Sequence, residues 1–304
     1  MQLIKPYCEI ITEKDPIKKI EIAGRTCYKS ENNITDNSAI KFFDALVKSN
    51  HTAMLEHATF VFLVNKKSYE EACRCKFLNA TYNEQKNRYL ISGNLRAINE
   101  SNLPILLDCL CRESTYSMRL CYADNAASKS WSNCDNNGQE AHLIDLDDLA
   151  DATFEEISTH KYTTMRFTTD RGVTHELVRH RLFSFAQEST RYCCYNSDKH
   201  GGGNIKFIMP AGFDSWYDED KEAFKSAMKR SEDEYNRMIQ RGFTAQQARA
   251  VLPNALKTEI VVTGNDAEWQ HFFDLRSKGT TGKPHPDMKV IADMAFELYL
   301  RLRG

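Results

Sequence analysis

A cluster of basic and polar side chains between residues 179 and 192 has the composition of a phosphate-binding site. Arg179, His180 and Arg181 are consecutive, and Ser189 and Arg191 follow shortly after them. Guanidinium groups bind phosphate oxygens through paired hydrogen bonds, and ordering several such side chains costs conformational entropy that an anionic partner offsets. The cluster therefore predicts that this segment binds an anion, with phosphate the first candidate. A solvated basic turn is the alternative that these residues alone leave open.

The cluster is expected at the end of a helix and in the loop after it. Thr174 is the expected N-cap, and Val173 and Val178 have the spacing of a hydrophobic staple. Successive residues on a helix point about 100° apart, so Arg179, His180 and Arg181 cannot all face one small ligand. They would serve two ligands, or one ligand and a neighbouring subunit.

Two familiar kinds of site are excluded by spacing. His175 and His180 flank Glu176 as in a zinc protease helix, but they are five positions apart instead of four and so differ by about 140° around the helix. The glycines at 201–203 lack the following Lys-Ser/Thr of a phosphate-binding loop. Phosphate would then be held by side chains that converge from distant parts of the chain. The candidates are Arg179, Arg191, Arg249 and Arg276. Structural ion pairs remain the alternative for Arg249 and Arg276.

Composition argues against several functional classes. The chain has 40 lysines and arginines against 42 acidic residues, so no global charge attracts nucleic acid or an anionic membrane. The longest apolar run, Ala58–Val64, is too short to cross a bilayer. The N-terminus lacks the apolar core of a signal peptide, and none of the ten cysteines forms a Cys-x-x-Cys pair. We expect a cytoplasmic protein with reduced thiols, no metal site, no nucleic-acid partner and no membrane association.

Hydrophobic periodicity predicts alternating helices and strands with no internal repeat and no domain linker. Helices are expected over 16–30, 38–49, 218–241, 267–275 and 289–301, and strands over 58–64, 161–169, 205–209 and 260–262. Asn94 is expected to open a further helix that runs towards Cys111. The polar segment within 113–150 is expected to be a solvated connector or surface insertion.

Taken together, these segments resemble the flavin-dependent thymidylate synthases. The sequence Arg179-His180-Arg181, seven residues and then Ser189 is similar to the signature of that family. Supporting similarity lies in residues 24–28, 51–62, 171–178, 248–253 and 265–276. Residues of about 65–160 carry little of this resemblance and are expected to be a family-variable expansion.

The resemblance implies an α/β (α+β) fold with a central mixed sheet flanked by helices, formed by one catalytic domain over 1–304. It further implies a homotetramer whose active sites lie at subunit interfaces. The implied reaction is the reductive methylation of dUMP to dTMP. Methylenetetrahydrofolate would donate the carbon, FAD would supply the hydride, and NADPH would reduce the flavin.

The resemblance also implies roles for individual residues. Residues expected to contact FAD are His51, Arg179, His180, Arg181, Gln187, Asn265 and His271. Residues expected to hold dUMP are Glu176, Arg179, Gln187, Glu188, Ser189, Thr190, Arg191, Arg249 and Arg276. Arg276 would be the catalytic residue, because a cation against the uracil favours ionisation at N3 and makes the ring a better carbon nucleophile. Ser189 has no evident histidine–carboxylate relay and is interpreted as a substrate ligand.

Several positions depart from the common pattern of the family. Gln187 stands where some members have a carboxylate, which removes a charge but keeps a hydrogen-bonding group. Cys27, Ala53, Ala267 and His271 replace serine, threonine, arginine and asparagine of some members. A non-catalytic protein that binds a nucleotide or flavin is the main alternative function. An RNA-binding module that uses the basic helix is a third, and the balanced net charge argues against it.

Overall fold

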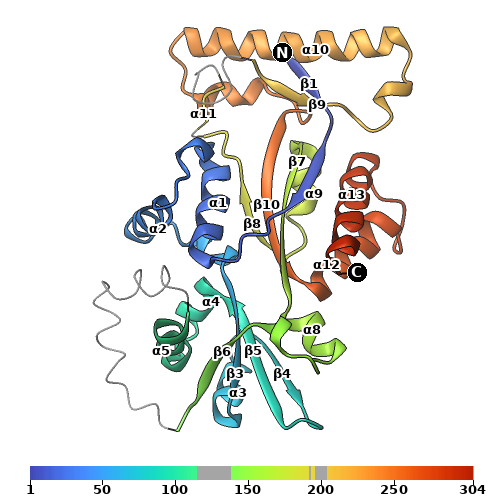
Figure 1. Cartoon of the computed structure of the whole chain (residues 1–304). Coiled ribbons are helices and arrows are strands. Elements are labelled where there is room, and N and C mark those ends of the chain that lie inside the picture. Colours follow the sequence, from blue (N-terminus) through green and yellow to red (C-terminus); the bar gives the residue numbers. More distant parts are fainter. Residues whose placement is uncertain (115–137, 192, 196–203, 304) are drawn as a thin grey trace.

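The computed structural model describes residues 1–114, 138–191, 193–195 and 204–303 (Figure 1). Its described strands form three sheets with helices packed around them, which confirms the α/β class. Both four-stranded sheets are antiparallel throughout, and the one parallel pair among the described strands forms a separate sheet, so the central sheet is antiparallel where a mixed one was expected. Tyr192, Gly201–Gly203 and most of the expected connector within 113–150 lie outside the described residues.

The core sheet has the strand order β2-β7-β10-β8. Its strands are β2 (Tyr7–Ile10), β7 (Tyr162–Asp170), β10 (Lys257–Asn265) and β8 (Ser184–Gln187). Successive side chains of a strand face opposite sides of a sheet. Ile260 and Val262 therefore pack with the hydrophobic cluster that includes Trp269, while Val261 packs with Ala23 on the other face. The two faces are covered by α12 (Asp266–Phe273) and α13 (Pro286–Arg303) on one side and by α1 (Pro16–Tyr28) on the other.

A second sheet, with the order β4-β5-β3-β6, forms the lower part of the molecule in Figure 1. It consists of β4 (Asn79–Asn83), β5 (Arg88–Asn94), β3 (Thr59–Val64) and β6 (Ala141–Ile144). Its helices are α3 (Lys66–Ala72), α4 (Leu95–Glu100), α5 (Pro104–Glu113) and α8 (Phe154–His160). We call the described residues 59–160 the second-sheet lobe. Apart from β3, its elements all come from the segment expected to be an expansion.

The third sheet is the parallel pair of β1 (Gln2–Ile4) and β9 (Lys206–Ile208). It packs with the 23-residue helix α10 (Asp218–Gln240), which crosses the top of the molecule in Figure 1, and with α11 (Ala245–Ala248). The remaining long helix, α2 (Ser38–Lys48), packs beside α1. The core therefore extends over three clusters of buried apolar side chains and one small additional cluster.

Local details differ from expectation at two helix starts. The helix before the basic cluster, α9 (Arg171–Leu177), is capped by Asp170, whose Oδ1 accepts a hydrogen bond from Val173 N at 2.8 Å. Thr174 is therefore not the cap; it lies inside the helix, where its hydroxyl donates to Arg171 O. The helix expected from Asn94 towards Cys111 is two helices, because Asn102 has a left-handed φ of 58° and Pro104 starts α5.

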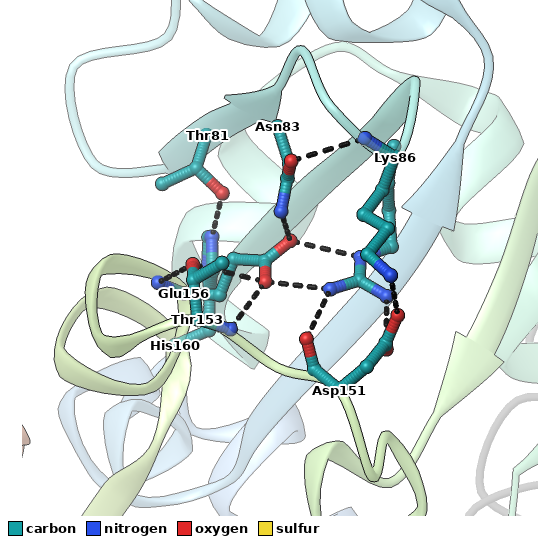
Figure 2. A network of polar contacts seen from close by, with 8 residues as sticks. Thr81, Asn83, Lys86, Asp151, Thr153, Glu156 and His160 are labelled. Carbon is teal, nitrogen blue, oxygen red and sulfur yellow. Dashed lines mark hydrogen bonds and ion pairs between the residues drawn. The ribbon is translucent and has the colours of Figure 1, made fainter.

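Within the second-sheet lobe, a polar network fastens the sheet to α8, which leads into the core strand β7 (Figure 2). Arg88 of β5 donates two hydrogen bonds to the carboxylate of Glu156, at 2.8 and 2.6 Å, and a third to Asp151 at 2.7 Å. His160 bridges Thr81 and Ser92 with contacts of 2.8 and 2.7 Å. Burial lowers the pKa of His160 to about 4, so its ring is neutral at physiological pH.

We predict that Arg88→Met lowers the free energy of unfolding by about 3 kcal/mol, because it leaves the Glu156 carboxylate buried without its cation. The side chains of Arg88 and Glu156 are 11% and 2% exposed. Urea denaturation at neutral pH measures this change. The control is Arg237→Met, which removes a surface pair with Glu234 and should cost no more than about 0.5 kcal/mol. Equal effects of the two substitutions would contradict the structural role of the network.

Candidate functional site

Arg276 lies in a π-helical segment, Asp274–Lys278, that continues α12. Its Nη1 donates to Glu176 Oε2 at 3.1 Å, and its Nε donates to His180 Nε2 at 3.2 Å. These three residues come from parts of the chain that are about a hundred positions apart. The structure thus brings together the expected catalytic arginine, an expected substrate residue and an expected flavin residue. π-Helical turns are rare and often occur at functional sites.

The turn that carries His180 is fixed by close packing against β10. Phe183 is buried and its ring centroid lies 4.6 Å from that of Trp269. A Cβ on Gly264 would lie 2.2 Å from the Phe183 ring, so only glycine permits this approach. Trp269 is itself held by a hydrogen bond of 3.1 Å from its Nε1 to Thr163 O. The position of the basic cluster is therefore set by the core and not by loop flexibility.

His180 is a neutral hydrogen-bond acceptor for Arg276. Burial, reinforced by the positive charge of Arg276 and by His271, lowers the pKa of His180 to about 4. The ring packs edge-on against Phe272, with centroids 5.2 Å apart, and lies 6.0 Å from the ring of His271. A neutral acceptor orients the guanidinium without adding a second positive charge. Arg276 keeps a partly exposed side chain, at 22%, which leaves room for a ligand.

The segment 187–191, which we call the Gln187–Arg191 loop, is anchored through Glu188. The Glu188 carboxylate is 2% exposed and accepts hydrogen bonds from Lys257 Nζ at 2.9 Å and Tyr195 Oη at 3.3 Å. Its backbone N–H donates to Glu259 O, and its carbonyl accepts from Arg171 Nη2. The carboxylate of Glu188 therefore points into the protein, and the neighbouring residues form the accessible part of the loop.

The anchor of the loop belongs to a buried charge cluster of two lysines and two glutamates. Glu259 pairs with Lys29 at 2.7 Å and also with Lys257. Although burial alone would raise it, the pKa of Glu259 is lowered to about 2 by the two lysines. Because the charges of Lys29, Lys257, Glu188 and Glu259 balance, each ion in the cluster has a partner. The loop is thus attached to β10 and to the end of α1 by ionic contacts.

Thr190 and Arg191 contact the segment that contains Arg249, and Ser189 contacts the end of α1. Ser189 N donates to Cys27 O at 2.9 Å, and its Oγ accepts from Arg191 N at 3.3 Å. Arg249 Nη1 donates to Thr190 Oγ1 at 3.0 Å. The structure therefore gathers two guanidinium groups and two hydroxyl groups, all expected to hold substrate, around one loop.

Gln187 and Asn265 use their side chains to stabilise the fold. Gln187 Nε2 donates to Thr174 Oγ1 at 2.8 Å and to Thr258 Oγ1 at 3.3 Å. Asn265 Oδ1 caps α12 by accepting from Glu268 N, and its Nδ2 donates to Thr159 O, both at 3.0 Å. These contacts leave Oε1 of Gln187 for a ligand, and they leave one N–H and one lone pair of the Asn265 amide.

Asn265 and Arg181 line one cleft of about 310 Å³ between the core and the second-sheet lobe. Within the described part of the chain, neither Arg179 nor Arg181 forms an ion pair, and both are exposed. The cleft is also lined by Glu56, Asn94 and Arg96, which the sequence reasoning did not assign to the site. Arg96 Nη1 pairs with Glu56 at 2.9 Å. Glu56 lies in segment 51–62, which resembles the family, and this resemblance could have indicated that Glu56 belongs to the site.

His51 stands apart from the three groups of site residues in its contacts. It precedes the 3₁₀ helix Thr52–His57, and its Nδ1 lies 2.9 Å from Tyr28 Oη. Among the described residues, no hydrogen bond or ion pair joins it to Arg179, His180 or Arg181. Its expected contact with flavin stays a prediction.

Neither a metal-binding cluster nor a membrane-crossing helix occurs among the described residues. No group of three or more metal-ligating side chains is placed there to hold a metal ion. Among the described helices, none combines the length and the apolar character that a bilayer crossing requires. The eight described cysteines are free thiols.

Comparison with known proteins identifies the family. The chain matches the family described as "Thymidylate synthase complementing protein" over residues 9–101 and 111–301. The chain belongs to this family. The match confirms the resemblance carried by Arg179-His180-Arg181 and Ser189, and it extends into the second-sheet lobe.

Individual relatives agree with this assignment. The chain is 32% identical over 200 residues to the flavin-dependent thymidylate synthase of Mycobacterium avium, covering 60% of this chain and 73% of that protein. It is 40% identical over 103 residues to that of Geobacter sulfurreducens, covering 34% of this chain and 42% of the relative. A crystal structure of the UMP/dUMP methylase PolB from Streptomyces cacaoi bound with 5-Br dUMP is similar over 99% of this chain and 93% of its own. That similarity has a TM-score of 0.43 and 14% identity, which is too low to bear on substrate.

We predict that the His180 ring stays neutral down to about pH 5, because burial and the adjacent Arg276 disfavour its protonated form. Two-dimensional NMR of the histidine rings should place its pKa near 4. Arg276→Gln should raise that pKa because it removes the neighbouring positive charge, while Arg301→Gln at an exposed position should leave it unchanged. A His180 that titrates near 6.5 in the unaltered protein would contradict the arrangement.

Proposed function

We propose that the chain is a flavin-dependent thymidylate synthase that converts dUMP to dTMP. Methylenetetrahydrofolate supplies the carbon, reduced FAD supplies the hydride, and NADPH reduces the flavin. The observation that carries the proposal is the fixed guanidinium of Arg276, held by Glu176 and His180 in a chain of this family. Flavin-dependent thymidylate synthase is the activity named for the relatives from Mycobacterium avium and Geobacter sulfurreducens.

The residues around the cleft fit a flavin dinucleotide. Arg181 lines the cleft, and Arg179 lies two positions before it in the chain. Both are exposed cations without an ion pair among the described residues, as a pyrophosphate group requires. Leu182 lines the cleft and is 73% exposed, so it offers apolar surface to a ring. The amide of Asn265 adds a polar group at the same cleft. When bound, the flavin supplies the two-electron reduction, and the protein supplies placement and charge.

Arg276 provides the electrostatic part of the mechanism. A guanidinium against the uracil ring stabilises negative charge that develops when N3 loses its proton, and the ring carbon becomes a better nucleophile. Glu176 and His180 hold the guanidinium in advance, so little reorganisation is needed when substrate arrives. Because His180 is neutral, it adds no second positive charge that would repel the guanidinium of Arg276.

The Gln187–Arg191 loop holds the substrate phosphate. Arg191 and Arg249 supply two cations, and Ser189 and Thr190 supply hydroxyl groups beside them. Lys257 and Tyr195 fix the loop through the buried Glu188 carboxylate. Phosphate binding therefore requires little ordering of the backbone, which lowers its entropic cost.

No protein nucleophile is needed for this chemistry. Burial raises the pKa of the Cys27 thiol to about 11 and that of the Cys193 thiol to about 12. Both residues adjoin the Gln187–Arg191 loop and remain protonated at neutral pH, so neither is an activated thiolate. The one-carbon unit is instead attacked by the uracil ring itself.

We also infer that the protein is a homotetramer with active sites between subunits and that it acts in the cytoplasm. The consecutive basic residues Arg179, His180 and Arg181 support active sites between subunits, because they cannot all face one small ligand of their own chain. The free thiols support a reducing compartment. Light scattering coupled to size-exclusion chromatography tests the tetramer, and a monomer that is fully active would contradict it.

The proposed function is tested by the flavin spectrum of the purified protein. We expect bound yellow flavin that bleaches when NADPH is added without oxygen, and dTMP formation once dUMP and methylenetetrahydrofolate are present. A protein that binds nucleotide but neither bleaches nor forms dTMP would instead be the non-catalytic binding protein.

We predict that Arg276→Ala lowers the rate of dTMP formation at least about 10²–10³-fold, the usual effect of removing a preorganised electrostatic group. Flavin binding should stay within about twofold of the unaltered protein, because Arg276 acts on the uracil. Product assay and flavin fluorescence measure the two effects. Arg301→Ala at an exposed position is the control, and turnover by Arg276→Ala equal to that control would remove the assigned role.

We predict that Arg179→Ala weakens the binding of both FAD and dUMP, by about tenfold each, because a charge-assisted hydrogen bond is lost to each ligand. Isothermal titration with each ligand measures the two affinities. Arg241→Ala, an exposed arginine at the end of α10, should change neither. Unchanged affinity of Arg179→Ala for both ligands would place this residue outside the shared site.

A further inference from the structure

The second-sheet lobe forms one wall of the cleft that contains Arg181 and Asn265. Lys76 and Phe77, which lie between α3 and β4, belong to this wall, as does Arg96 of α4. The core contributes the opposite wall through Arg181 and Leu182. A segment that the sequence indicated only as an expansion therefore reaches the same cleft as residues of the family signature.

The charges of this cleft are not all paired among the residues that the structure describes. Arg96 is occupied by two carboxylates, since it pairs with Glu56 and Glu100 at 2.9 Å each. Lys76 and Arg181, by contrast, form no ion pair within the described part of the chain. Glu268 is the remaining acid at the cleft, and burial raises its pKa. Two free cations on opposite walls favour an anionic ligand between them.

Apolar surface accompanies each of the two cations. Phe77 is 64% exposed and Leu182 is 73% exposed, although both are large apolar side chains. The Lys76 ammonium lies 5.4 Å from the centroid of the Phe77 ring. Each wall thus presents a cation followed in sequence by an exposed apolar side chain. This pairing fits a ligand that has both a flat ring and a phosphate group.

The lobe wall is held rigidly enough to act as a binding surface. Leu78, next to Phe77, is buried, and a Cβ on Gly93 would lie 2.5 Å from its Cδ2. Asn79 Nδ2 donates to Tyr162 Oη of the core strand β7 at 2.7 Å. The network of Arg88 and Glu156 fastens the same sheet to α8 (Figure 2). Phe77 is therefore presented by a fixed backbone, and ligand binding requires little ordering of the lobe.

We propose that Lys76 and Phe77 bind an anionic dinucleotide, with Phe77 against a ring and Lys76 against a phosphate. The two dinucleotides of the reaction, FAD and NADPH, share this chemistry, and naming them rests on the proposed function. The lobe then contributes to the active site in addition to stabilising the fold. Its ligand-binding residues are distinct from Arg179 and Arg181.

Three variants and two matched controls test this proposal in the full-length protein. Lys76→Gln and Phe77→Ala remove the cation and the ring, while Lys76→Arg keeps the charge. The controls are Lys66→Gln and Phe154→Ala, which alter lobe side chains that are 71% and 87% exposed and do not line the cleft. Flavin fluorescence measures the Kd for FAD. Stopped-flow absorbance of the flavin-saturated protein measures the NADPH concentration at half-maximal flavin reduction.

We expect Lys76→Gln and Phe77→Ala each to raise either the Kd for FAD or the NADPH concentration at half-maximal flavin reduction by about tenfold. Lys76→Arg should give values close to those of the unaltered protein. A weaker FAD Kd identifies the flavin as the ligand of this wall, and a higher NADPH requirement identifies the reductant. If the unaltered protein binds FAD and neither quantity changes in the variants, the proposal is overturned while the proposed function stands. If the unaltered protein binds neither dinucleotide, both are overturned. Thermal unfolding of each variant verifies that it is folded.

Discussion

The guanidinium of Arg276 is held by two acceptors, Glu176 and His180, from a single short stretch of chain, and the geometry of the candidate site depends on this contact. It joins the π-helical end of α12 to the turn after α9. Phe183 positions that turn independently of Arg276, because it packs into the space left by Gly264. Because His180 is kept neutral by burial, the contact orients the cation without weakening it. Basic residues that flank His180 then project outward, where a dinucleotide can reach them.

A second constraint is the balance of buried charge beneath the Gln187–Arg191 loop. Lys29 and Lys257 form ion pairs with Glu188 and Glu259. These ion pairs fix the loop, although its other polar residues are proposed to bind a ligand. The sheet of the second-sheet lobe is fixed to α8 in a comparable way by Arg88 and Glu156, and Asn79 joins this sheet to Tyr162 of β7. Rigid attachment of both elements to β7 and β10 lets side chains from distant segments converge on neighbouring sites. The preorganisation of these groups is the physical basis of the proposed catalysis.

Much of the fold was predictable from periodicity, while contacts between distant segments were not. The helices at 16–28, 38–48 and 218–240 and the strand at 59–64 were expected nearly as they are, because their apolar spacing is regular. The cap of α9 is Asp170, four positions before the expected Thr174, because the helix begins directly where β7 ends. The break between α4 and α5 depends on Asn102 and Pro104, which interrupt an otherwise helical pattern.

Most residues of the site were named from resemblance. Only four arginines were expected to converge on physical grounds, because a phosphate held by side chains needs several cations: Arg179, Arg191, Arg249 and Arg276. Arg276 and Glu176 are a hundred positions apart, and periodicity carries no information about such pairs. The burial of Glu188 could not be foreseen either, since its partners Lys257 and Tyr195 lie on other elements. The part of the lobe that lines the cleft was missed because Lys76 and Phe77 have no motif around them. Their significance appears only when the cleft is seen with both walls in place.

The proposed mechanism requires that reduced flavin and dUMP react in one site without a protein nucleophile. A single-turnover experiment tests it most directly: the protein is loaded with reduced FAD under anaerobic conditions and mixed with dUMP and methylenetetrahydrofolate. We predict that the flavin is reoxidised only when both substrates are present, with about one dTMP formed for each flavin reoxidised. Formation of dTMP without flavin reoxidation, or reoxidation without dTMP, would contradict the account.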